Sequence, residues 1–269
     1  MSFTSLSSGA KTLAKTVLNR DSRILLRRLW YSGTQYHCNV CNNNVRTMLT
    51  RGYPFPVLTE LDVIGGETLP FDTCPICFGN SRTRLLSEYI ARQTNVHSRV
   101  SPISILHIAP EYGILARLRA NKAIDYRAVD ISPQDAEGVA YCDITAIAVV
   151  DESFDLIICS HVLEHIPDDR RAMTELFRVL KRGGTAILQV PISASLARTL
   201  EDPWLSDPRE RERRFGQHDH VRIYGPDYTA RLKECGFRVE SFDPKSRWGH
   251  AAVAELRLNP REKLFIGRK

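Results

Sequence analysis

Four cysteines near the N-terminus have the spacing of a metal site. Cys38 and Cys41 form one C-x-x-C pair, and Cys74 and Cys77 form a second pair after 32 intervening residues. Zinc takes four soft ligands in a tetrahedron, and one C-x-x-C turn supplies two of them. Four thiolates leave no open coordination position, so we expect a structural zinc ion (Zn²⁺) without a catalytic role. A redox-active pair or four buried thiols are the alternatives, but two such pairs favour zinc.

The stretch between the two pairs is longer than in most zinc ribbons. Such pairs are commonly about 15–20 residues apart, so we expect Val45–Leu61 to add a strand and a loop. Cys142, Cys159 and Cys235 lie in apolar strands or at a helix end and are interpreted as core residues. No apolar secretory segment is found at the N-terminus, which favours a reducing compartment over disulfide bonds.

A second group of polar residues lies where short apolar segments end. The runs Ser104–Ala109, Tyr126–Ile131 and Phe154–Ser160 predict strands that alternate with helices, a pattern typical of a parallel sheet covered on both faces. Ligands bind such a sheet outside the carboxyl ends of its strands, where the strand order reverses. The candidate positions at these ends are Ala109–Gly113, Asp130, Cys142-Asp143 and Ser160-His161.

Two acids among these positions have the order expected for a nucleotide site. Asp130 ends a strand 17 residues after Gly113, about where nucleotide-binding folds place an acid that holds ribose hydroxyls. Asp143 follows a short strand and could accept a hydrogen bond from an adenine amino group. Either acid alone could be a helix cap, and only their order and spacing together indicate nucleotide binding.

The second half of the chain continues the alternation of helices and strands. Pro167-Asp168-Asp169 predicts a helix start with acids in the first turn, and the residues after it form one apolar helix face. Lys181–Gly184 is interpreted as the cationic last turn and glycine cap of that helix, followed by a strand at Thr185–Val190. Gly225-Pro226-Asp227 opens the last predicted helix, and Phe237–Phe242 is the strand after it.

Three segments carry a resemblance to a known family. Ser153–Ile157 (SFDLI), Ser160–Ile166 (SHVLEHI) and Arg178–Gly184 (RVLKRGG) resemble class I S-adenosylmethionine-dependent methyltransferases, in the branch called methyltransferase type 11. The likeness covers roughly Ile103–Phe242, and Cys74–Cys77 also resembles the zinc ribbon that precedes this domain in some members. It implies an α/β, Rossmann-like seven-stranded sheet that binds S-adenosylmethionine, with a small N-terminal zinc-ribbon module.

The resemblance also implies which residues hold the cofactor. The methionine end would lie on Ala109–Gly113, the ribose on Asp130, the adenine on Asp143, and the methyl group near Ser160-His161. The implied cofactor set is Ala109, Pro110, Glu111, Gly113, Asp130, Ile131, Asp143, Ile144, Ser160 and His161. The loop departs from the family's D-x-G-x-G-x-G, because only Gly113 remains and Glu111 would resist a positive φ. We expect a different loop path, in which Glu111 could meet the cofactor's ammonium group.

The densest polar cluster of the chain lies between a predicted strand and a predicted helix, at Gln217–Arg222. Methyl transfer to an amine or hydroxyl requires loss of a proton, and histidine is the natural base near neutral pH. We expect His161 or His220 to take that proton and Arg222 to meet the acceptor. The predicted substrate-binding residues are Gln217, His218, Asp219, Arg222 and Tyr224. A metal held by the consecutive residues His218, Asp219 and His220, or a solvated loop, is the alternative.

Composition and charge limit the class of protein. With 43% hydrophobic and 25% charged residues the chain is globular, and no apolar run is long enough to cross a membrane. The formal charge is +6, of which residues 1–35 carry +5, so the rest offers no long nucleic-acid track. We expect a basic arm at 1–33 whose helix packs Leu25, Leu26, Leu29 and Trp30 on the protein itself. A zinc ribbon at 34–95 and a methyltransferase domain at 96–269, with an acceptor-binding insertion near 194–225, follow.

The function predicted from these observations is methylation of a small polar acceptor at oxygen or nitrogen, such as a sugar or natural-product intermediate, in the cytoplasm. An RNA methyltransferase that grips its substrate through the zinc ribbon is one alternative. It has thin support, because Arg46 and Arg51 are the two basic residues between Cys38 and Cys77. A non-catalytic descendant that binds S-adenosylmethionine is another, and an organelle transit peptide is an alternative for the basic, Ser-rich N-terminus.

Overall fold

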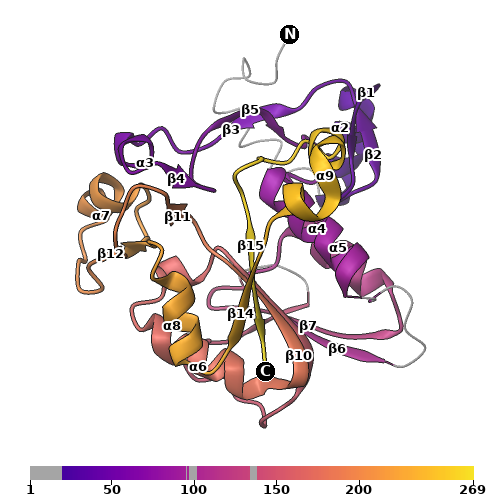
Figure 1. The fold of residues 1–269 in the computed structure, drawn as a ribbon. Helices are drawn as coiled ribbons and strands as arrows, with labels where there is room; N and C mark the ends of the chain where they lie inside the picture. The colour runs from indigo at the N-terminus through magenta and orange to yellow at the C-terminus, as the bar shows by residue number, and fades with distance from the viewer. Residues whose placement is uncertain (1–19, 95, 97–101, 134–137) are drawn as a thin grey trace.

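The computed structural model describes residues 20–94, 96, 102–133 and 138–269. In this part of the chain a seven-stranded sheet has the order β14-β15-β10-β9-β6-β7-β8 (Figure 1). Its strands are β6 (Ile103–Ile108), β7 (Ile124–Asp130), β8 (Val139–Tyr141), β9 (Phe154–Ser160), β10 (Leu180–Gln189), β14 (Arg238–Phe242) and β15 (Leu264–Arg268). The seven-stranded α/β sheet expected from the sequence is therefore confirmed.

The order of the strands creates a single switch point. The chain runs from β6 outward to β7 and β8, then returns to the other side of β6 with β9 and β10, and all these neighbours are parallel. β15 is antiparallel to both β10 and β14, between which it lies. β6 and β9 are thus adjacent strands whose chains leave in opposite directions, and a ligand site is expected at their carboxyl ends.

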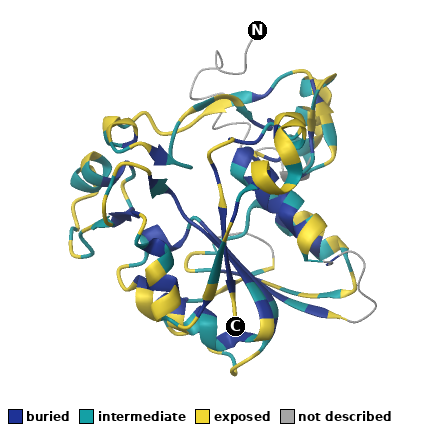
Figure 2. Ribbon diagram, viewed as in Figure 1, coloured by how far each residue is buried: buried dark blue, intermediate teal, exposed yellow. Residues whose placement is uncertain are grey.

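Helices cover both faces of the sheet, and each face has its own apolar core. Figure 2 shows buried positions along the central strands and on the helices that face them. The first face carries α4 (Ser81–Gln93), α5 (Tyr112–Ala120) and α9 (Pro244–Glu255), and the second carries α6 (Asp169–Val179) and α8 (Tyr228–Glu234). In α6, Asp168 caps the backbone N–H of Arg171 and the predicted apolar face is buried, which confirms that helix.

Two predicted boundaries are wrong. Lys181–Gly184 is not a helix cap, because β10 begins at Leu180, which pairs with Phe154, and Gly183 takes a φ of +73° where the register shifts. The glycine therefore serves a bulge in a strand. The helix at 225–235 is also not the last, since Asp243 caps the backbone N–H groups of Lys245 and Ser246 at the start of α9.

The N-terminal part consists of short elements. They are α2 (Arg20–Tyr31), β1 (Ser32–Cys38), β2 (Asn43–Val45), β3 (Leu49–Arg51), α3 (Pro56–Glu60), β4 (Val63–Ile64) and β5 (Leu69–Thr73). β1 pairs with β2 and β3 with β5, both antiparallel. The short helix η2 (Leu163–His165) follows β9. The insertion after β10 contains β11 (Ile192–Ser193), β12 (Leu200–Glu201), α7 (Pro208–Phe215) and β13 (Arg222–Ile223).

The expected packing of the basic arm is wrong for the residues that the structure describes. Leu25, Leu26, Leu29 and Trp30 are 44–69% exposed, although they lie on a helix as predicted. The helix instead turns Ile24 and Tyr31 toward the core, and the leucine face points outward. Residues 1–19 of the arm lie outside the described residues. Among the described helices, none is long and apolar enough to cross a membrane.

Candidate active site

The four predicted zinc ligands lie together. The Sγ atoms of Cys38 and Cys77 are 3.7 Å apart, those of Cys41 and Cys74 are 3.8 Å apart, and all four lie within 4.8 Å of one another. A tetrahedron with Zn–S bonds of about 2.3 Å places its sulfur atoms about 3.8 Å apart. Gly79 also donates its backbone N–H to Sγ of Cys77. The geometry is therefore that of a closed four-thiolate site.

This cysteine cluster packs directly on the start of α5. A Cβ atom at Gly113 would lie 2.5 Å from Cγ1 of Val40 and 3.3 Å from Cβ of Cys77. The first distance is far shorter than a van der Waals contact, so a side chain at this position would push the N-terminal part away. Gly113 is thus required for close approach of the cysteine cluster to the loop that follows β6.

The loop after β6 has its positive φ at a residue other than glycine. The positive φ is at Ala109 (+46°), while Glu111 has an ordinary φ of −66° and begins α5. Oε2 of Glu111 lies 3.0 Å from Nε2 of His107, whose Nδ1 is 2.9 Å from the hydroxyl of Tyr126. Burial raises the pKa of the Glu111 carboxyl, but the hydrogen bond with His107 holds it below its ordinary value.

The two predicted acids lie at the carboxyl end of the sheet. Asp130 ends β7, and its Oδ1 accepts the backbone N–H of Ser132 at 2.8 Å. Asp143 follows β8 and accepts from the backbone N–H and the hydroxyl of Thr145, both through Oδ1 at 2.8 Å. These two bonds lower the pKa of Asp143. Of the two isoleucines that follow these acids, Ile131 is 55% exposed and Ile144 is buried. An exposed apolar side chain such as that of Ile131 can cover a flat ring.

A cavity of about 90 Å³ lies beyond the end of β9. Three parts of the chain enclose it: the segment between the two cysteine pairs, the turn after β9, and the insertion after β10. β4 pairs with β11 and α3 packs on α7, which joins the first part to the third. We call it the histidine cavity after His161, His165 and His220 in its wall. Its other lining residues include Tyr53, Leu58, Val63, Gly65, Arg82, Glu164, Phe215 and Gln217.

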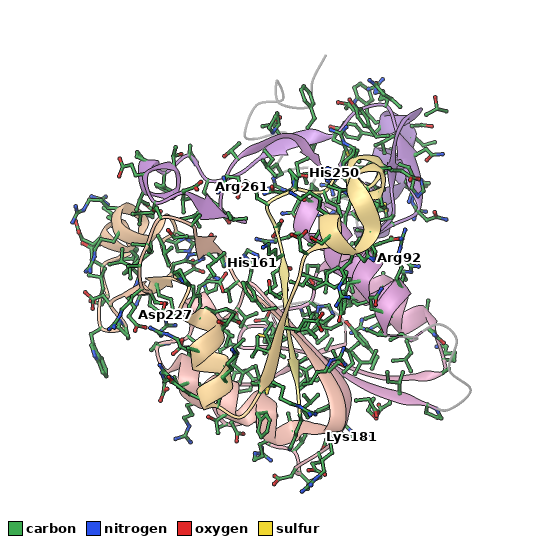
Figure 3. The ribbon with its side chains drawn as sticks, in the orientation of Figure 1. Arg92, His161, Lys181, Asp227, His250 and Arg261 are labelled. Carbon is green, nitrogen blue, oxygen red and sulfur yellow. The ribbon has the colours of Figure 1, made fainter. Side chains whose placement is uncertain are left out.

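His161 lies at the centre of this arrangement (Figure 3). Its φ is +56°, an uncommon value for a residue with a Cβ atom and one that is often found at functional sites. Nη1 of Arg82 donates to Nδ1 of His161 at 2.8 Å, and a Cβ atom at Gly65 would lie 3.3 Å from the ring. Burial, together with the charge of Arg82, lowers the pKa of His161 to about 4, so the ring is neutral. Because Nδ1 accepts, the ring proton is on Nε2.

The predicted cluster at 217–222 divides into a part that lines the cavity and a part that does not. The rings of His165 and His220 meet edge to face, 4.5 Å between centroids, and Nδ1 of His165 lies 3.2 Å from Oδ2 of Asp219. Gln217 donates to Asp219 from its side-chain amide. Burial lowers the pKa of His220 to about 4. The side chain of His218 is 65% exposed and contributes no wall.

Arg222 and Tyr224 are both buried, and Arg222 is also among the residues that line the histidine cavity. Arg222 is 1% exposed and donates to three backbone carbonyls, those of Leu163, Ile166 and Pro167, and to Glu201. Tyr224 is fully buried and donates its hydroxyl to Asp169 at 2.7 Å. Both side chains therefore fasten the insertion to the turn after β9.

Three residues at this site were not predicted. Glu164 is 1% exposed, with Oε1 3.3 Å from Nδ1 of His161. Arg82 reaches the cavity from the first turn of α4. Glu262 accepts from Gln189, and burial raises its pKa to about 8. Glu164 lies in the SHVLEHI segment and Arg82 in a basic run, so both carried a sequence signal; Glu262 carried none.

The chain was compared with known proteins. A family model described as a methyltransferase domain matches residues 79–242. A rice (Oryza sativa subsp. japonica) protein named 2-methyl-6-phytyl-1,4-hydroquinone methyltransferase 1, chloroplastic, is 31% identical over 126 residues, 44% of this chain and 36% of the rice protein. Its second rice form is 28% identical over 116 residues, 42% of this chain and 30% of that protein. The chain thus matches about a third of the length of these curated relatives.

Solved structures resemble the chain at lower identity. An S-adenosylmethionine-dependent methyltransferase from Mesorhizobium loti is 17% identical with a TM-score of 0.44, over 71% of this chain and 99% of that one. One from Archaeoglobus fulgidus is 15% identical with a TM-score of 0.44, over 69% and 94%. The family model spans more than half of the chain, in the region that holds the switch point and its acids. The chain belongs to the methyltransferase-domain family.

Proposed function

We propose that this enzyme methylates a small polar acceptor, at oxygen or nitrogen, that binds in the histidine cavity. The observation that carries the proposal is the position of this cavity at the carboxyl end of β9, beside the switch point and enclosed by three parts of the chain. Enclosure matters because methyl transfer needs alignment of the acceptor and exclusion of water. The rice relatives are named for a hydroquinone substrate, which supports a small-molecule acceptor.

The residues at the strand ends fit S-adenosylmethionine. Asp130 would accept from the ribose hydroxyls, and Asp143, whose bonds to Thr145 reach Oδ1, has Oδ2 for the adenine amino group. Nε of Arg82 is buried and has no hydrogen-bond partner among the described residues, so it can bind the carboxylate of the methionine end. Glu111 can meet its ammonium group. When bound, the cofactor supplies a methyl group on a sulfonium, which is an activated leaving group.

The side chains of the histidine cavity would then orient and activate the acceptor. His161 carries its proton on Nε2, which has no partner among the described residues, and so donates a hydrogen bond rather than acting as the base. The groups with lone pairs directed at the cavity are Glu164 and His220. They can take the acceptor's proton directly or hold a cation that makes the acceptor more acidic. Of the two histidines predicted as the base, we therefore favour His220 for the case without a cation.

Turnover can be tested without knowing the natural acceptor. Formation of S-adenosylhomocysteine is measured with a panel of small phenols, catechols, sugars, amines and carboxylic acids, and in parallel with RNA. Activity on one small-molecule class, lowered by about 10²–10⁴ in His220→Ala with cofactor affinity unchanged, supports the proposal. Methylation of RNA without turnover of any small molecule would overturn it, as would full activity in His220→Ala.

We further propose that Cys38, Cys41, Cys74 and Cys77 bind a structural zinc ion. The support is the near-tetrahedral spacing of their sulfur atoms and their position away from the histidine cavity. We also propose a reducing compartment such as the cytoplasm, in which cysteines of this kind bind metal or stay reduced. We also propose that the basic arm ends at residue 33 and that the zinc ribbon ends at residue 95.

A further inference from the structure

Three side chains in the wall of the histidine cavity have the composition of a metal site. Glu164, His165 and His220 each offer one ligand atom, and these atoms lie within 4.8 Å of one another. Ligands of zinc bound at about 2.0–2.1 Å in a tetrahedron lie about 3.4 Å apart. Modest side-chain rotations would therefore bring all three onto one ion. This set differs from the consecutive trio His218, Asp219 and His220 considered from the sequence.

The carboxylate of Glu164 lacks the partners that a buried charge needs. It is 1% exposed, and neither oxygen accepts a hydrogen bond from any residue that the structure describes. His161 Nδ1 is 3.3 Å from Oε1, but it already accepts from Arg82 and has no proton to give in that arrangement. A buried, unpaired carboxylate is costly, and a cation is one of the few groups that offsets this cost.

The outer contacts of His165 are those of a metal-bound imidazole. Its Nδ1 is directed at Oδ2 of Asp219, and Gln217 in turn donates to Oδ1 of Asp219. A carboxylate on one ring nitrogen fixes the tautomer, so that the other nitrogen, Nε2, presents a lone pair. His220 packs edge to face on this ring, with one of its ring nitrogens in the same group of ligand atoms.

We propose that Glu164, His165 and His220 bind a divalent transition-metal cation, for which zinc is the probe, and that its open positions hold an oxygen atom of the acceptor. Two histidines and one carboxylate make a three-ligand site, the type that leaves at least one position open for water or substrate. All three residues line the histidine cavity, so the open side faces the acceptor.

The proposal that the cation holds the acceptor rests on the proposed function, whereas the proposal that these three residues bind a cation does not. In this arrangement His220 is a ligand and not a free base. A hydroxyl bound to the cation becomes more acidic and releases its proton to water, just as zinc lowers the pKa of a bound water. The resulting oxyanion attacks the methyl carbon; the new C–O bond forms as the C–S bond breaks, and the sulfur leaves with the bonding pair as neutral S-adenosylhomocysteine.

Zinc content tests the cation site without any acceptor. Full-length protein and its variants are dialysed against a zinc-buffered solution, and bound zinc per chain is measured by elemental analysis. Glu164→Gln and His220→Ala should each bind one zinc fewer than the wild type, with an affinity loss at that site of more than about a hundredfold, and Asp219→Asn should lose about 10–100-fold. His218→Ala is the matched control from the same loop and should bind as the wild type does.

A folding defect is separated from loss of a ligand by thermal unfolding. With zinc bound at the cysteine cluster alone, Glu164→Gln should be no less stable than the wild type, because it removes an unpaired buried charge, but further zinc should no longer raise its unfolding temperature. The cation site is refuted if Glu164→Gln and His220→Ala keep the wild-type zinc content. Wild-type zinc content in these variants, when the wild type methylates a small molecule, would refute the cation alone. Loss of one zinc from the variants, when the wild type methylates no small molecule, would refute the proposed function alone.

Discussion

Replacing Arg222 tests whether this residue stabilises the fold or binds the acceptor, as its sequence suggested. Its guanidinium lies in the protein interior and donates to the carbonyls of Leu163, Ile166 and Pro167 as well as to Glu201. In Arg222→Ala these acceptors lose their donors inside the protein, and the ion pair with Glu201 is broken from one side. Removing one partner of a buried pair costs about 3–5 kcal/mol. We expect a loss of that size in the free energy of unfolding.

The measurement is equilibrium unfolding in urea, where the midpoint falls and the slope is unchanged if only stability is affected. Arg222→Lys keeps the charge but cannot reach several acceptors at once, so its loss should be intermediate. Arg214→Ala is the matched control: it breaks the half-exposed pair with Asp202 in the same insertion and should cost less than about 1 kcal/mol. A stable Arg222→Ala protein with a raised KM for the acceptor would refute this reasoning and restore the substrate role.

Three further predictions concern the metal, the cofactor and pH. Cys41→Ser should lose the zinc of the cysteine cluster and lower the unfolding temperature, because the binding energy of a structural site contributes to folding; a metal-free wild type of full stability would contradict it. Asp130→Ala should weaken S-adenosylmethionine binding about 10–100-fold in calorimetry while the fold is kept, since a charge-assisted hydrogen bond is lost; unchanged affinity would mean that the ribose binds elsewhere. Burial raises the pKa of Glu262 from 4.5 to about 8, so the folded protein keeps a proton that the unfolded chain releases. The free energy of unfolding should therefore fall as the pH rises from 6 to 8, by up to about 1.4 kcal/mol per pH unit when compared with Glu262→Gln. An equal pH dependence of the two proteins would show that Glu262 is ionised in both the folded and the unfolded state.

The local sequence pattern was sufficient to predict elements whose signal lies within their own residues. β9 has the predicted limits Phe154–Ser160, because an unbroken apolar run between turn residues is the pattern of a strand buried on both faces. The glycines at 183–184 were misjudged for a local reason as well. A glycine after a cationic turn is typical of a helix end, but a positive φ also suits a bulge, and only pairing with β9 distinguishes the two.

Burial of charged groups could not be predicted in the same way. Arg222 was predicted to meet the acceptor because it lies in a polar loop, and its buried bonds to Leu163 and Glu201, from distant parts of the chain, were not foreseen. An arginine becomes an interior residue only where several acceptors converge on it, and that convergence depends on the tertiary fold. The same applies to Glu164, whose importance follows from the approach of His220 across more than fifty intervening residues.

The long spacing between the two cysteine pairs gains a physical reason from the histidine cavity. The residues between the pairs provide the helix α3, where a strand and a loop were expected, and the strand β4 beyond that stretch. The helix α3 packs on α7 and the strand β4 pairs with β11, and together they form one wall of the cavity. Both ends of this segment are fixed at the cysteine cluster, which itself packs on Gly113 beside the cofactor loop. A zinc ion held there would take no part in the chemistry, yet it would determine where that wall lies. Loss of the zinc should therefore loosen the acceptor side of the enzyme before it affects the sheet that holds Asp130 and Asp143.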